Sequence, residues 1–60
     1  NVYAYSEGVS VRGFTGLVKI HNILGQQSKE VLTEGNVDIM LDKGVYIVVL
    51  GAKAFKVVVK

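Results

Sequence analysis

The sequence has no cysteine and no proline, and it holds only one histidine. Without cysteine, neither disulfide bonds nor thiolate metal sites can stabilise the chain, and cysteine usage cannot indicate the redox state of its compartment. No apolar run approaches the roughly 20 residues that a membrane-spanning helix needs, and no signal-peptide pattern opens the chain. We therefore expect a single small domain over residues 1–60, held by its hydrophobic core alone and not inserted in a membrane.

Residues that could perform catalysis or bind a metal are also scarce. His21 would need a nucleophile and an orienting carboxylate nearby to act as a general base, and no Gly-x-Ser-x-Gly or comparable signature is present. Glu34, Asp38 and Asp42 lack the dense alternation of acidic residues that calcium loops show. The sequence therefore predicts a non-enzymatic protein with no catalytic residues, no metal and no cofactor.

The charge balance is weak, with a net charge of +2. The basic residues are spread through the chain except for Lys53, Lys56 and Lys60 near its end. A tilt of this size is more typical of a solubility feature than of a nucleic-acid-binding surface. We expect no nucleic-acid partner.

What the chain does contain is β-forming sequence, above all in its C-terminal third, from Lys43 to Lys60. Two runs rich in β-branched and aromatic residues, 45–50 and 54–59, flank a short Gly-Ala-Lys segment, which predicts a β-hairpin. With a two-residue loop, one face gathers the residues that we expect in the core. These residues are Tyr46, Val48, Leu50, Phe55, Val57 and Val59, whereas Lys56 and Lys60 point the other way.

The preceding sequence shows short alternating segments separated by glycine-containing turns, which is typical of all-β proteins. The expected strands are 2–5, 9–12, 18–21, 26–32 and 37–41, with turns at 6–8, 14–16, 22–25, 33–35 and 42–44. Asn22 and Gly25 suit the first and fourth positions of a type I turn, and we interpret Gly25 and Gly44 as backbone-conformation residues. With the C-terminal hairpin this makes about seven short strands, an antiparallel sandwich or, as the runner-up, a small barrel.

Two features leave alternatives open. Val45, Ile47 and Val49 make the second face of their strand apolar, which fits either a central strand beside lysine-bearing neighbours or a docking face. Tyr3 and Tyr5 lie outside if Val2 and Ala4 are the buried residues of the first strand. They could then bind a sugar or single-stranded nucleic acid by stacking.

Because the chain starts at Asn1 and not at Met, and strand-like sequence begins at once, we expect it to be a piece of a longer protein. Any export signal would then lie elsewhere in that precursor.

Three segments together resemble a known family. The order VKIHNILGQ (18–26), VDIMLDKGVYIVVL (37–50) and KVVVK (56–60) is similar to the C-terminal sorting domains of the type IX secretion system of Bacteroidetes and to related C-terminal β modules. The matching positions are Ile20, His21, Gly25, Gln26, Gly44, Tyr46, Val48, Lys56 and Lys60. His21 replaces the usual tyrosine of the family, and the chain lacks the Asn-Pro motif that often opens such domains.

The resemblance implies an immunoglobulin-like sandwich at the end of a larger exported protein, which passes through the periplasm to the cell surface or the medium. It implies a sorting or anchoring module recognised by outer-membrane secretion machinery or packed on the parent protein's other domains. Strand addition at an open edge would be a plausible mode of recognition. The alternative hypothesis is a carbohydrate-binding or adhesive module that uses Tyr3 and Tyr5.

Overall fold

The protein, seen in a computed structural model that describes residues 2–60, is all-β. Asn1, on which the expectation of a longer precursor rests, lies outside the described residues. The five strands are β1 (Val2–Tyr5), β2 (Gly8–Asn22), β3 (Gln27–Met40), β4 (Gly44–Leu50) and β5 (Lys53–Val59). All pairings are antiparallel, so the predicted all-β class is confirmed.

The predicted number of strands is wrong, since residues 2–60 form five strands and not seven. The expected turns at 14–16 and 33–35 are bends inside two long strands, because the ladder between β2 and β3 continues through them. In that stretch Phe14 pairs with Gly35, Thr15 with Glu34 and Gly16 with Thr33. Glycines at these positions bend the paired strands without ending them.

A β-bulge at Gly13 explains why β2 looks like two strands in the sequence. The register with β3 shifts between Arg12 and Phe14, so Gly13 is an extra residue, and its positive φ of 69° is typical of such a bulge. Before the bulge the buried hydrophobic residues are the odd-numbered Val9 and Val11, and after it they are the even-numbered Val18 and Ile20. One inserted residue therefore keeps both halves of β2 facing the same core.

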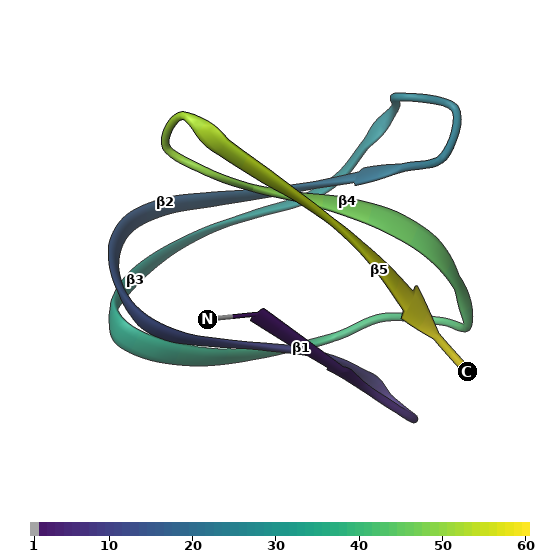
Figure 1. Cartoon of the computed structure of the whole chain (residues 1–60), viewed down its shortest axis with the longest axis horizontal. Helices are drawn as coiled ribbons and strands as arrows, with labels where there is room; N and C mark the ends of the chain where they lie inside the picture. Colours follow the sequence, from purple (N-terminus) through teal and green to yellow (C-terminus); the bar gives the residue numbers. More distant parts are fainter. Residues whose placement is uncertain (1) are drawn as a thin grey trace.

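The sheet curls so that its two halves face each other (Figure 1). The N-terminal half-sheet contains β1, residues 8–12 of β2 and residues 36–40 of β3, and the C-terminal half-sheet contains the remaining parts of β2 and β3 with β4 and β5. Both long strands take part in both halves. Among the described residues, β3 pairs with β2 alone, and its other side is an open edge.

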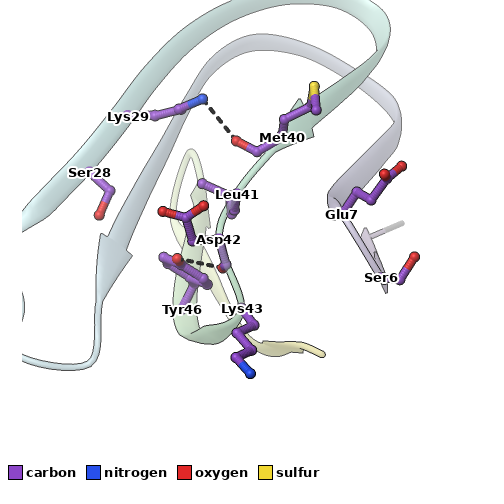
Figure 2. A pocket seen from close by; sticks show the side chains of 9 residues that line it. All are labelled: Ser6, Glu7, Ser28, Lys29, Met40, Leu41, Asp42, Lys43 and Tyr46. Atoms are coloured by element: carbon purple, nitrogen blue, oxygen red, sulfur yellow. Dashed lines mark hydrogen bonds between the residues drawn. The ribbon is translucent and has the colours of Figure 1, made fainter.

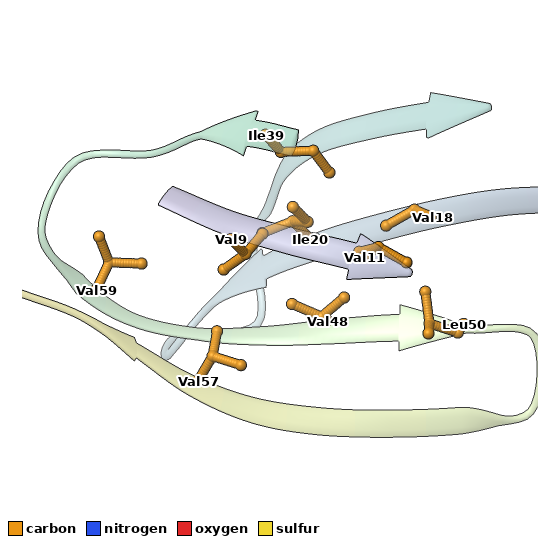
Figure 3. Packing of buried hydrophobic residues seen from close by; sticks show 9 residues of the cluster. All are labelled: Val9, Val11, Val18, Ile20, Ile39, Val48, Leu50, Val57 and Val59. Carbon is orange, nitrogen blue, oxygen red and sulfur yellow. The ribbon is translucent and has the colours of Figure 1, made fainter. Parts of the chain in front are cut away.

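The hydrophobic core lies between the two half-sheets and is almost entirely aliphatic (Figure 3). Fully buried side chains of this size contribute about 1.5–3 kcal/mol each, so the loss of one removes a large part of the small net stability expected for a chain of this length. The N-terminal half-sheet contributes Val9, Val11 and Ile39, and the C-terminal half-sheet contributes Val18, Ile20, Val48, Leu50, Val57 and Val59.

The predicted C-terminal hairpin is confirmed. β4 and β5 are joined by a two-residue turn, with Leu50 opposite Lys53, Val48 opposite Phe55 and Tyr46 opposite Val57. The side chains expected on the core face are buried or half-buried, and Lys56 and Lys60 are exposed.

The predicted turn between β2 and β3 is also present. Asn22 Oδ1 accepts hydrogen bonds from the amides of Leu24 (2.9 Å) and Gln26 (3.0 Å), and the Gly25 amide donates to the Asn22 carbonyl (2.9 Å). Gly25 has a φ of 86°, a conformation that side chains with a Cβ disfavour. The side-chain amide of Asn22 also donates to Gln26 Oε1, which closes the turn.

Candidate interaction surface

The residues singled out by the family resemblance lie side by side, although they come from three separate segments. Ile20 of β2 is directly opposite Val48 of β4, and both are fully buried. The turn residue Asn22 is opposite Tyr46, and Gly44 is opposite Val59. Gly25 and Gln26 belong to the turn beside them. Most of these positions therefore build the fold, and only Lys56 and Lys60 are exposed side chains outside the core and the turn.

Tyr46 has a structural role that its sequence position alone does not reveal. Its ring lies over Gly44, and its hydroxyl donates a 2.7 Å hydrogen bond to the backbone carbonyl of Asp42. A tyrosine bound to the backbone a few residues upstream also fixes strand corners in immunoglobulin-like domains. Here the contact holds the connection between β3 and β4 against the start of β4.

The outward side of the C-terminal half-sheet has an apolar surface that we call the outer sheet face. Directly opposite residues of paired antiparallel strands share a face. Leu17 is opposite Leu32, and Val45 is opposite Val58. Leu17 is 41% exposed, Leu32 76% and Val58 48%. The outer sheet face consists of Leu17, Leu32, Val45, Ile47, Val49 and Val58.

Basic side chains lie among these apolar ones. Lys19 is opposite Val49, and Ile47 lies between His21 and Lys56 of the flanking strands. β4 is thus a central strand beside lysine-bearing neighbours, whose long aliphatic stems can cover its outward residues. This agrees with the half-burial of Val45, Ile47 and Val49, while the leucines of β2 and β3 remain exposed.

Tyr3 and Tyr5 lie on the outside of the N-terminal half-sheet. Tyr3 is opposite Ser10 and Tyr5 is opposite Gly8, and their exposed fractions are 54% and 38%. Val2 is opposite the buried Val11 and packs on the core, whereas Ala4, the other residue expected to be buried, is exposed. On the other side of Ser10, Asp38 forms an ion pair with Arg12 at 3.5 Å.

A polar cleft of about 550 Å³ lies on the open side of the curled sheet (Figure 2). Glu7, Lys29 and Asp42 line it, together with Tyr46. The Lys29 ammonium donates to the Met40 carbonyl at 2.8 Å, and the Leu41 amide donates to the Glu7 carbonyl at 2.9 Å. These bonds tie both ends of β3 and the turn before β2 together, so we assign the cleft a structural role.

The structure also bears on the metal and membrane-spanning possibilities. Within residues 2–60, no three histidine or acidic side chains lie close enough together to hold a metal ion. Over the same residues no helix is of the length and apolarity that crossing a bilayer requires. His21 is a half-buried residue of β2 that faces outward beside Ile47.

Sequence reasoning missed the leucines of the outer sheet face. Leu17 alternates with the buried Val18, so its outward direction was readable once 14–22 is taken as one strand. Leu32 was placed in a strand, but its neighbour Leu17 is recognisable only from the register between β2 and β3. What the sequence does not show is which residues of β2 and β3 pair with each other.

The fold and these surfaces define a small all-β domain built from one curled antiparallel sheet. The chain belongs to a family described as a domain of unknown function (DUF6383), whose model matches residues 1–59. No curated protein and no solved structure gives a significant match to the chain.

Proposed function

We propose that this domain is a non-catalytic sorting or anchoring module of a larger exported protein, of the kind that its resemblance to type IX sorting domains implies. The observation that carries the proposal is the outer sheet face. Exposed leucines on β2 and β3 and partly exposed valines on β4 and β5 face the same side of the C-terminal half-sheet, where a partner could cover them. Apolar surface concentrated in this way is typical of interaction sites.

The partner would be the outer-membrane secretion machinery during export, or the other domains of the parent protein after it. Lys19 and Lys56 lie among the apolar residues, and Glu30 is opposite Lys19, so the face carries charges of both signs. This favours a partner surface that combines apolar side chains with charges of both signs. The open edge of β3 offers a second element of recognition, because unpaired backbone groups can accept an added strand.

We propose the finer fold assignment, an immunoglobulin-like sandwich, together with this function. Two half-sheets facing each other across an aliphatic core support it, as does the bond from the Tyr46 hydroxyl to the Asp42 carbonyl. If β2 and β3 are each divided at their bends, the ladder yields seven segments, the number that the resemblance implies.

The function can be tested by fusing the domain to a periplasmic reporter in a Bacteroidetes host that has the type IX system. We expect the wild-type fusion to reach the cell surface or the medium. Leu32→Asp should retain the reporter in the periplasm, because it places a charge on the outer sheet face without touching the core. Met40→Asp is the matched control, since Met40 is 67% exposed but lies on the other half-sheet.

Circular dichroism and thermal melting of the purified domains would show that both variants fold. A stable wild-type fusion that stays in the periplasm would overturn the sorting function. Equal export of both variants would show that sorting does not use the outer sheet face.

A second candidate function, carbohydrate binding, is favoured by the outward tyrosines. Two aromatic rings two residues apart on the same face, near the Arg12–Asp38 pair, form a plausible stacking surface for a sugar. Glycan-array binding that is lost in Tyr3→Ala and Tyr5→Ala would support it, whereas absence of binding in the wild-type domain would eliminate it.

A further inference from the structure

An open groove of about 910 Å³ lies between the β4–β5 turn and the segment of β2 around Gly13. The β4–β5 turn is at the upper left in Figure 1. Its apolar lining consists of Val2, Phe14, Leu50 and Phe55, with Tyr3 and Lys53 also present. It shares no residue with the outer sheet face and is independent of the proposed function.

The groove exists because two pieces of backbone with little side chain meet there. Gly13 forms the bulge in β2, and Gly51 and Ala52 form the turn between β4 and β5. All three line the groove, and none can cover it with a large side chain. The rings of Phe14 and Phe55 pack against the core and remain partly exposed. The end of the core is therefore accessible to a ligand.

The charge in this groove is of one sign. Lys53 is the only charged residue among those that line it, and no carboxylate of the described residues does so. An anion beside the Lys53 ammonium would gain a charge-assisted hydrogen bond, strengthened by the apolar lining. The volume lies within the range of about 300–1,000 Å³ that small-molecule sites occupy.

We propose that this groove binds a small amphipathic anion, whose apolar body contacts Phe14 and Phe55 while its carboxylate or sulfonate lies at Lys53. The apolar body could be an acyl chain or an aromatic ring, since both present the same chemistry to the groove. Neither a neutral apolar compound nor an apolar cation would use the lysine.

The test uses the full 60-residue chain and the fluorescent probe 1-anilinonaphthalene-8-sulfonate, which joins aromatic rings to one sulfonate. Loss of the charged partner in Lys53→Gln should weaken binding by roughly tenfold, the effect of losing one charge-assisted hydrogen bond. Ala52→Asp, a substitution in the exposed turn, should also weaken binding, because it places a second negative charge beside the sulfonate of the probe. Lys56→Gln, on the same strand but the opposite face, should leave binding unchanged.

The neutral probe N-phenyl-1-naphthylamine separates the charge effect from the apolar contact, because its binding should not respond to Lys53→Gln. Amide chemical shifts locate the site, and the sulfonate probe should move those of Gly13, Gly51 and Ala52. Laurate and 1-naphthoate then compete with the probe, and displacement by either supports an anion site. The stronger competitor shows whether the groove prefers an acyl chain or an aromatic ring.

Three results would overturn the proposal. The first is equal affinity of wild type and Lys53→Gln for the sulfonate, and the second is displacement by neither competitor. The third is a set of shifted amides confined to the outer sheet face, at Val45 and Val58, which would show that the probe binds there.

Discussion

Val48 is the residue on which most of the C-terminal half-sheet depends. It is fully buried, with Ile20 opposite it on one neighbouring strand and Phe55 on the other. A side chain in this position contacts the core from the centre of three paired strands. Lys56, on the next strand, projects to the outside and is exposed.

We expect Val48→Asp to unfold the domain, because an unpaired carboxylate in this core should cost more than about 3 kcal/mol of a small total stability. Lys56→Gln should change the free energy of unfolding by less than about 0.5 kcal/mol, since it alters an exposed side chain. Urea denaturation followed by circular dichroism measures both. Small and equal effects would show that the two faces of the hairpin are assigned wrongly.

Gly25 offers a cleaner test of backbone conformation. No atom lies within 4 Å of the position that a Cβ would occupy, so a larger residue causes no clash. We expect Gly25→Ala to lower the free energy of unfolding by about 1–2 kcal/mol through its left-handed φ alone. Gly25→Asn should lower it by less, because asparagine tolerates this region better. Identical stabilities of the alanine and asparagine variants would contradict this explanation.

At the scale of elements, the bulge in β2 decides how the sheet curls. Gly13 shifts the alternation of β2 by one residue, and its amide donates a 3.1 Å hydrogen bond to Asn36 Oδ1 of β3. This bond links β2 to β3 at the place where one half-sheet passes into the other.

Deletion of Gly13 should prevent folding, because it would turn either Val9 and Val11 or Val18 and Ile20 to the outside. Gly13→Ala keeps the residue count and should cost only about 1–2 kcal/mol for its positive φ. Two-dimensional NMR spectra distinguish the outcomes, with a collapsed spectrum expected for the deletion and a dispersed one for the substitution. A folded deletion variant would show that the ladder can re-register.

The comparison of sequence with structure is also clearest at this scale. Local signals predicted the C-terminal hairpin and the Asn22–Gly25 turn, since both depend on residues close together in the chain. The same glycine signals were misleading at 14–16 and 33–35, because a bend and a turn use the same residue types. Only the partner strand distinguishes them, and the pairing of Phe14 with Gly35 is not written in either segment. Leu17 and Leu32 of the outer sheet face were missed for the same reason, whereas the alternation within a single strand was enough to single out Val45, Ile47 and Val49.

At the scale of the whole molecule, β2 and β3 belong to both half-sheets, and the core lies between them. Neither half can lose its packing without exposing the apolar side of the other. The domain should therefore unfold as one cooperative unit, as most small domains do.

We expect urea titration to give the same unfolding midpoint for Val11 of the N-terminal half-sheet as for Val48 and Val57 of the C-terminal one. Residue-resolved NMR peak intensities measure these midpoints. Val11 is the sensitive position in this comparison, because its only neighbour on one side is the short edge strand β1. An earlier transition at Val11 than at Val48 would show that the half-sheets separate before global unfolding.

The bond between the Lys29 ammonium and the Met40 carbonyl has a consequence for the behaviour of the chain in concentrated solution. It occupies an acceptor at one end of β3 that a foreign strand would otherwise seek. Lys29→Ala should remain folded yet self-associate as its concentration rises, which light scattering would reveal. Lys29 would thus help to keep the domain soluble by blocking strand addition at this end of β3.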